Sequence, residues 1–173
     1  MGVVVYLRPY LYESFGVDLT QVHGFQTGMI LTLLAKVGTD LSKWNTDKYF
    51  KSWLGLCVNE GISGGKVLKN KTRKVCNRAS GALRMAATSL RNSNSYLGVF
   101  NKRIRGRAGA PKAVTATAAK LAVIFYSMVK FQNEYKALEV SYYDENYKKR
   151  VFKSVKNRAK SLGYKLVPIE KLA

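Results

Sequence analysis

The stretch PKAVTATAAKLAVIFYSMVK, residues 111–130, decides the fold class. Its apolar residues recur every three or four positions, the spacing of a helix with one buried face. Pro111 suits the first turn because its fixed φ is helical and its missing N–H would be unpaired there anyway. The most apolar run, 121–129, lies between Lys120 and Lys130 and is far shorter than the roughly 20 residues that span a bilayer. We therefore expect a core helix of a globular protein and no membrane partner, with a buried stripe of Val114, Ala118, Leu121, Phe125 and Met128.

Other segments repeat this helical spacing. Residues 27–38 place five apolar side chains on one face before Gly38, residues 45–56 direct Phe50, Trp53 and Leu54 inward, and residues 77–90 form a further helix. From Val140 to Leu162 the pattern predicts a long amphipathic helix, in which we interpret the tyrosines at 142, 143 and 147 as packing residues. These patterns predict an all-α fold with an N-terminal lead-in (1–17), a compact helical domain (18–133) and a C-terminal helical extension (134–173).

Residues 18–38 resemble a helix-hairpin-helix module, with a short helix, a turn at Val22–Phe25 and a second helix. In such modules the N–H groups that open the second helix meet a DNA phosphate. Gln26 stands where a second glycine is usual, so two packed helices are an equally good interpretation. We interpret His23 as a turn residue.

Charge is unevenly distributed along the chain, which has 30 basic and 10 acidic residues. Residues 61–133 contain fifteen Lys and Arg and no Asp or Glu, whereas residues 1–60 are neutral. Such a tract repels itself, and acids between the cations would relieve that repulsion. A polyanionic partner is therefore expected, and nucleic acid is favoured because phosphate neutralisation releases counterions.

The stretch GISGGKVLKNKTRK, residues 61–74, contains the most informative motif. It is not a phosphate-binding loop, because only three residues separate Gly61 from Gly65 and Val67 follows the lysine. Its glycines are compatible with a simple turn between helices. Alternatively, the loop presents Ser63 as a nucleophile among cations that hold a phosphate. Serine needs an activating base, and neither histidine nor carboxylate lies nearby in the sequence.

Lys102, Arg103, Arg105 and Arg107 crowd what we expect to be a linker before the Pro111 helix. A loop that contacts a nucleic-acid backbone and a solvated loop both fit this segment. The two cysteines, Cys57 and Cys76, with a single histidine, do not make a four-ligand zinc site and are interpreted as reduced thiols.

Several blocks together resemble the C-terminal half of the IS-one-ten (IS116/IS110/IS902-type) group of bacterial insertion-sequence transposases. They are VGTDLSKW and FKSWLGLC (37–57), ISGGKVLKNKTRKVCNRASGALRMAATSL (62–90) and LGVFNKRIRGRAGAPKAVTATAAKLA (97–122). YYDENYKKR and RAKSLGYKLVP continue the resemblance, which covers roughly residues 11–168. Ser63 occupies the position of the family's serine motif, and the resemblance implies that it is the nucleophile.

The resemblance also implies DNA and a structured guide RNA as partners, and a homo-oligomer or a full-length transposase as a protein partner. It implies an N-terminal RNase-H-like domain with four acidic metal ligands, so that Mg²⁺ belongs to that domain and no cofactor to this chain. With Ser63 as the catalytic candidate, the candidate nucleic-acid-binding residues are Gly64, Gly65, Lys66, Lys69, Lys71, Arg73, Lys74, Arg78, Arg84, Lys102, Arg103, Arg105, Arg107 and Lys112.

Some positions depart from the family pattern: Val58 replaces proline, Ala119 histidine and Ser80 alanine, while Gln132 and Asn133 alter a turn that usually contains glycine. These departures and the lead-in MGVVVYLRPY suggest a truncated copy, located in the cytoplasm with the nucleoid and not expected to be active alone. The expected function is DNA transposition and recombination. The alternatives are a non-catalytic nucleic-acid-binding relic or repressor and an unrelated ribosomal-type RNA-binding protein.

Overall fold

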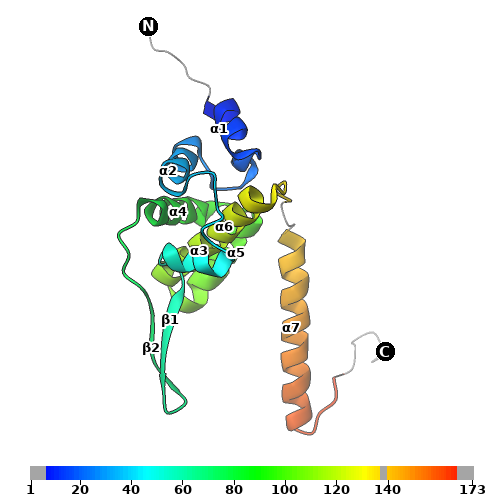
Figure 1. Ribbon diagram of the computed structural model, residues 1–173. Helices are drawn as coiled ribbons and strands as arrows, with labels where there is room; N and C mark the ends of the chain where they lie inside the picture. Colours follow the sequence, from blue (N-terminus) through cyan, green and yellow to red (C-terminus); the bar gives the residue numbers. More distant parts are fainter. Residues whose placement is uncertain (1–6, 137–139, 167–173) are drawn as a thin grey trace. The chain divides into compact units, whose positions relative to one another are not determined.

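Helix α6 (Ala110–Phe131) packs against three other helices of its unit (Figure 1). It contacts α3 (Asp47–Trp53), α4 (Arg78–Ser89) and α5 (Tyr96–Ala108). The predicted stripe is confirmed, since Ala118, Leu121, Phe125 and Met128 are buried and Val114 is partly buried. By length and composition alone α6 is apolar enough to cross a membrane, but its apolar face is covered by these three helices.

The computed structural model describes residues 7–136 and 140–166, except for the side chains of residues 59, 60, 67–70, 140–147 and 150. The chain divides into two compact units, residues 1–137 and 138–173. The boundaries predicted at 17/18 and 133/134 remain predictions.

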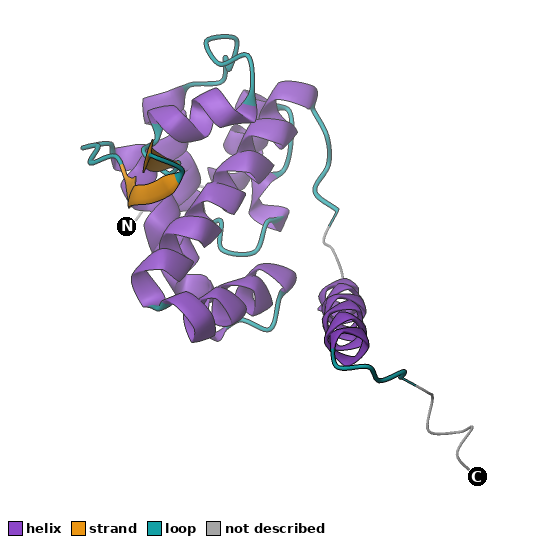
Figure 2. Cartoon of the chain, turned by 90° about the horizontal axis from the view of Figure 1, so that it is seen from below, coloured by secondary structure: helices purple, strands orange, loops and turns teal. Residues whose placement is uncertain are grey.

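The first unit is built mainly from helices, with two short strands beside them, as Figure 2 shows, which confirms the all-α class. Helix α1 (Leu7–Phe15) packs on α2 (Thr27–Val37), and α2 packs on α4. Ile30, Leu33 and Val37 of α2 are buried, as their spacing predicts. The rings of Phe15 and Phe50 both approach that of Phe125, with centroid distances of 5.7 and 6.0 Å. Segments from opposite ends of the unit therefore share one aromatic core.

The predicted helix-hairpin-helix segment begins with a single 3₁₀ turn, η1 (Leu19–Gln21), in place of a short α-helix. The turn that follows is closed by a 2.9 Å hydrogen bond from the Phe25 N–H to the Val22 carbonyl. Gly24 has a φ of 96°, and a Cβ there would lie 3.0 Å from the Leu90 side chain. This glycine is therefore required both by the backbone conformation and by a close approach to η2 (Leu90–Asn92). His23 is an exposed residue in this turn.

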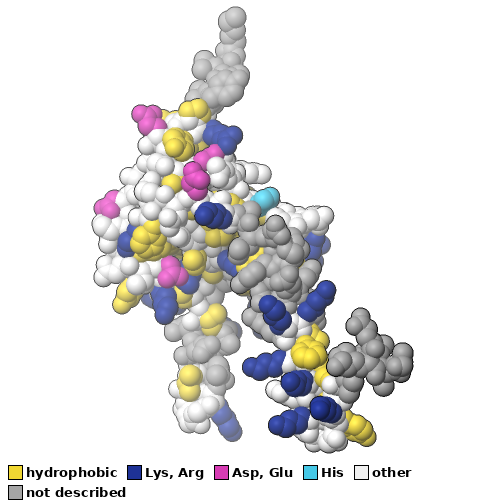
Figure 3. Space-filling view, turned by 90° about the vertical axis from the view of Figure 1, so that its right-hand side faces the viewer, with side chains coloured by type: hydrophobic (Ala, Val, Ile, Leu, Met, Phe, Trp, Pro, Cys, Tyr) yellow, Lys and Arg dark blue, Asp and Glu magenta, His cyan; other side chains and the backbone are white. Residues whose placement is uncertain are grey.

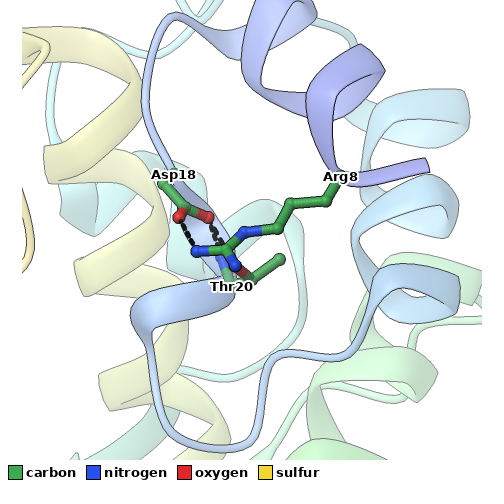
Figure 4. A network of polar contacts seen from close by, with 3 residues as sticks. All are labelled: Arg8, Asp18 and Thr20. Carbon is green, nitrogen blue, oxygen red and sulfur yellow. Dashed lines mark hydrogen bonds and ion pairs between the residues drawn. The ribbon is translucent and has the colours of Figure 1, made fainter. Parts of the chain in front are cut away.

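Asp18 joins α1 to η1 through three polar contacts (Figure 4). Its carboxylate accepts from the Arg8 guanidinium and from both the N–H and the hydroxyl of Thr20. The hydrogen bond from Arg8 is the main reason why the pKa of Asp18 lies below its ordinary value, with the Thr20 contacts adding to it against the opposing effect of burial. The same ion pair raises the pKa of Arg8.

Gln132 ends α6 in the left-handed conformation, with a φ of 53°, where a glycine is usual. Its side-chain amide donates to the carbonyls of Val129 at 2.8 Å and Phe15 at 3.1 Å. Gln132, one of the departures from the family pattern, thus connects the end of α6 to the end of α1. Its side-chain hydrogen bonds offset part of the free-energy cost of the left-handed backbone.

The loop before α3 is held by two side chains of α6. The carbonyl of Trp44 accepts from the Tyr126 hydroxyl at 2.7 Å and from the Lys130 ammonium at 2.8 Å. Lys130 also donates to the carbonyl of Asn45 at 3.1 Å. These bonds satisfy backbone carbonyls that the short loop does not pair itself, and they fix the position of Trp44.

The second unit contains helix α7 (Val140–Ser161), as the periodic pattern predicts. Gly163, with a φ of 83°, ends it, and the Tyr164 N–H returns to the carbonyl of Ala159 at 2.8 Å, as in other helices that end at a left-handed glycine. Figure 3 shows Lys and Arg side chains crowding this helix. Val151, Phe152 and Val155 are exposed, so within this unit the described part of the apolar stripe is uncovered. The side chains of the three tyrosines at 142, 143 and 147 lie outside the described residues.

Candidate nucleic-acid interface

Ser63 lies at the turn of a two-stranded antiparallel hairpin, β1 (Val58–Ser63) and β2 (Lys66–Thr72), which projects from the helices in Figure 1. Gly64 and Gly65 form its two-residue loop with φ values of 56° and 74°. Positive φ at both loop residues is the signature of the type I′ turn, whose twist matches that of paired strands. A Cβ on either glycine would meet nothing within 4 Å, so glycine is needed here for its conformation.

The sequence pattern predicts a turn between helices at this point, and the structure corrects this to a turn between strands. VNEGIS and KVLKNKT lack a clean alternation, and the pairing is shifted between Gly61 and Ile62, which face Lys69 and Val67. This register leaves Leu68 as the extra residue of a bulge, a device that re-aims a strand end. The G-G pair between two short runs was the available signal for a hairpin.

Ser63 and Lys66 are direct cross-strand partners, and both are exposed. Residues so paired have Cβ atoms roughly 5 Å apart, so the lysine side chain is long enough to reach a phosphate placed against the serine. Among the described side chains, neither a histidine nor a carboxylate is hydrogen-bonded to Ser63. The hairpin therefore presents a hydroxyl and a cation, without the hydrogen-bonded base among the described side chains that a serine nucleophile would need.

The predicted cations after the serine follow the hairpin back to the helices. Lys71, Arg73, Lys74 and Arg78 are exposed, whereas the side chain of Lys69 lies outside the described residues. Asn77 caps α4, since its side chain accepts from the Ala79 N–H at 2.9 Å, a bond that satisfies a free donor of the first turn. The structure thus brings these cations together along β2 and the segment that leads into α4.

Arg84 differs from the other candidates because it is partly buried. Its guanidinium donates to the carbonyl of Gly55 in a long bond of 3.5 Å, and its Nε is buried without a hydrogen-bond partner among the described residues. Gly55 has a φ of 65°, and a Cβ there would lie 2.7 Å from Val75. Arg84 therefore stands where α4, the base of β1 and the segment after β2 approach one another.

Lys102, Arg103, Arg105 and Arg107 lie on helix α5, which corrects the predicted linker. Ser95 begins this helix by accepting from the Gly98 N–H at 3.3 Å, and Leu97 and Asn101 are buried. Asn101 donates to the carbonyl of Ala87 on α4 and to the hydroxyl of Thr117 on α6. Tertiary contacts therefore stabilise a helix in a segment whose two glycines and four cations favour a loop. Lys112 is exposed in the first turn of α6.

A groove opens at the base of the hairpin, between α3 and the segment that precedes α4, and sequence reasoning did not find it. Trp53, expected to face inward, is 39 % exposed at this groove, and Tyr49 is 64 % exposed beside it. Helical spacing in α3 identifies the apolar face of the helix. It does not predict which side chains on that face a neighbouring segment covers. Within the described residues, no group of three or more His, Cys, Asp and Glu side chains is placed to hold a metal ion.

The family model of the transposase IS116/IS110/IS902 family matches residues 18–100. These residues run from Asp18, which joins α1 to η1, through the hairpin with Ser63 and α4 into α5. The matched residues thus point to the transposase class and to a role in transposition. The match over residues 18–100 confirms the resemblance of the sequence blocks to the IS116/IS110/IS902 family. Searches of the curated proteins and of the solved structures found no match.

Proposed function

We propose that this chain acts in DNA transposition as a DNA-binding domain with Ser63 as its nucleophile. The observation that carries the proposal is the exposed cross-strand pair of Ser63 and Lys66 at the tip of a hairpin. The exposed cations of residues 61–133 would bind the phosphate backbone, and Lys66 would contact the scissile phosphate. As in the family resemblance, the base and the Mg²⁺ site belong to an RNase-H-like domain, and a guide RNA and a second transposase chain complete the assembly.

The proposed step is a phosphoryl transfer with no change of oxidation state. The Ser63 hydroxyl gives its proton to a base on the partner domain, and its Oγ forms a bond to a DNA phosphorus. One phosphorus–oxygen bond of the strand breaks, and the released sugar oxygen takes a proton. Attack by another sugar hydroxyl on the phosphoserine then joins the strands and restores Ser63. Lys66 stabilises negative charge on the phosphate oxygens during both steps.

The test is the covalent phosphoserine adduct on DNA carrying an element end, with the partner domain and a guide RNA present. We expect the adduct with the wild-type chain and with Ser154→Ala, an exposed serine of α7, and none with Ser63→Ala. Absence of the adduct in the wild type, or an adduct that survives Ser63→Ala, would remove Ser63 from this role.

A non-catalytic binding module is the second candidate function, because the described side chains place neither a histidine nor a carboxylate on Ser63. It predicts steeply salt-dependent DNA or RNA binding, unchanged in Ser63→Ala, and no adduct under any of these conditions.

A further inference from the structure

The groove at the base of the hairpin combines aromatic and cationic side chains. It has a volume of about 950 Å³, at the upper end of the range typical of ligand sites. Trp44, Tyr49 and Trp53 supply its aromatic surface. Lys36, Lys43, Arg73 and Arg78 supply its charge, and neither Asp nor Glu is among the described residues that line it.

The aromatic wall is held in place by the core behind it. The rings of Trp44 and Trp53 lie 4.9 Å apart, and Phe50 stacks on Trp53 at 6.1 Å with an interplanar angle of 22°. Phe50 is fully buried, and the loop of Trp44 is anchored to α6 by Tyr126 and Lys130. Trp53 is thus held by two aromatic neighbours and is still exposed at the groove, so little conformational entropy is lost when a ligand stacks there.

The cationic wall is continuous with the hairpin. Arg73 directly follows β2, whose last residue, Thr72, pairs with Val58 at the start of β1. Arg78 begins α4, and the intervening segment passes so close to Gly55 that a Cβ there would collide with Val75. The six residues of β1 place Ser63 roughly 20 Å along the strand from this wall.

Stacking surfaces beside cations suit an unpaired nucleotide. In duplex DNA the base faces are covered by their neighbours, and phosphate contacts alone need no aromatic residues. A single strand offers both a free base face and phosphates, and one stacked base contributes about 1–3 kcal/mol by alanine substitution. An acidic peptide would satisfy the cations but would leave the exposed rings of Tyr49 and Trp53 without a stacking partner.

We propose that this groove binds an unpaired nucleotide of single-stranded DNA. The base stacks on Trp53 and Tyr49, and the flanking phosphates contact Arg73 and Arg78 on one wall and Lys36 and Lys43 on the other. The proposal rests on the proposed function for DNA as the partner, because the groove continues the hairpin that carries Ser63. It adds a site that holds a strand unpaired while the serine acts at the other end of the same hairpin.

The first test uses intrinsic fluorescence, because the two tryptophans of the chain both line the groove. We expect a short oligothymidine to quench this fluorescence, and Tyr49→Ala to weaken its binding about tenfold, which is the loss of roughly 1.4 kcal/mol of stacking. Tyr12→Ala removes a similarly exposed tyrosine from α1 and is expected to leave binding unchanged. Duplex binding, followed by the anisotropy of labelled DNA, is expected to be the same in all three proteins.

The second test needs no aromatic substitution. Cys76 lines the groove and is exposed, and in Cys57→Ser it is the single thiol of the chain. We expect saturating oligothymidine to slow its reaction with a maleimide at least fivefold. An unprotected Cys76, or a Tyr49→Ala variant that binds oligothymidine like the wild type, would overturn the proposal. Equal quenching by polyglutamate would also overturn it, because charge alone would then explain the binding. Quenching by oligouridine but not by oligothymidine would overturn it as well, because the ligand would then be RNA.

These outcomes separate the groove from the proposed function. If the Ser63 adduct forms while Cys76 stays unprotected, the proposal for the groove is wrong and the proposed function stands. If oligothymidine protects Cys76 while no adduct forms, the groove stands and the nucleophile fails.

Discussion

Asn101 and Thr117 are hydrogen-bonded to each other in the core, with 3.1 Å between the asparagine Nδ2 and the threonine hydroxyl oxygen. Both side chains are buried, and Asn101 also donates to the carbonyl of Ala87 at 3.3 Å. One amide therefore links α5 to both α4 and α6. Because buried polar groups are costly when unpaired, this link specifies which face of α5 docks.

Asn101→Ala is expected to destabilise the protein by about 2–3 kcal/mol, because it leaves the Thr117 hydroxyl and the Ala87 carbonyl unpaired and opens a small cavity. Chemical denaturation provides the measurement. The control is Asn157→Ala, at an exposed site on α7. A surface substitution of this kind is expected to change stability by at most about 0.5 kcal/mol. A double-mutant cycle with Thr117→Val that gave no coupling between the two sites would contradict the bond.

Gln132 offers a test of backbone strain at the end of α6. Gln132→Ala and Gln132→Gly both lose the bonds to Phe15 and Val129, but only alanine keeps a Cβ at a φ of 53°. We expect the glycine variant to be more stable than the alanine variant by about 1 kcal/mol in thermal or urea unfolding. Equal stabilities would mean that the turn relaxes when the side-chain bonds are gone.

The Gly64–Gly65 turn predicts a local effect of substitution. Gly65 has a φ of 74°, which alanine resists. Gly65→Ala is therefore expected to destabilise the hairpin by about 1–2 kcal/mol. Hydrogen exchange of the β1 and β2 amides measures this, while the exchange of α6 is expected to stay the same.

Gly81→Ala is the matched control for this substitution, because Gly81 lies in α4 with open space at its Cβ. It is expected to stabilise the protein by about 0.5–1 kcal/mol, since alanine loses less conformational freedom in a helix. Unchanged exchange of the hairpin amides in Gly65→Ala would contradict the conformation of the turn.

Asp18 gives the protein a dependence of stability on pH. Its pKa is lowered in the folded state by the bond from Arg8. Its contribution is therefore present above the unfolded pKa, near 4, and is lost as the pH falls through the lower folded value. Asp18→Asn is expected to lower the Tm at pH 7 and to have a shrinking effect below about pH 4.

The control for Asp18 is Asp47→Asn, which removes an ion pair with Lys51 within α3. It is expected to change the Tm little at either pH, because such pairs contribute little. A Tm difference for Asp18→Asn that is constant from pH 7 to pH 3 would refute the role of the ion pair with Arg8.

Two lysines of the basic tract are expected to behave in opposite ways. Lys74 is exposed, so Lys74→Met is expected to lower the slope of log K against log salt for DNA binding by about one, with an unchanged Tm. Lys130 is bonded to the carbonyls of Trp44 and Asn45. Lys130→Met is therefore expected to cost about 1–2 kcal/mol of stability and to leave the slope unchanged. The reverse pattern would contradict the assignment of Lys74 to DNA binding and of Lys130 to the fold.

Helices with a strong periodic stripe could be predicted because their burial follows from local spacing. Residues 27–38 and 111–130 form α2 and α6 with the expected faces buried. Helix α5 could not be predicted in this way, because Gly98 lowers its propensity and is needed for a close approach: a Cβ there would lie 2.2 Å from the Ser93 carbonyl oxygen. The hairpin was missed because its strands lack alternation and are held by a glycine turn.

The sequence by itself determined the helical class, the family, the acid-free basic tract and the block that contains Ser63, because composition, periodicity and motif order are properties of the chain alone. Only the tertiary structure decided that Ser63 meets Lys66 across a hairpin, that Lys130 is bonded inside the fold, and that Trp53 lines a groove with Arg73 and Arg78. The reason is physical: spacing identifies the apolar face of a helix, but which residues are covered depends on segments distant in sequence that pack against it.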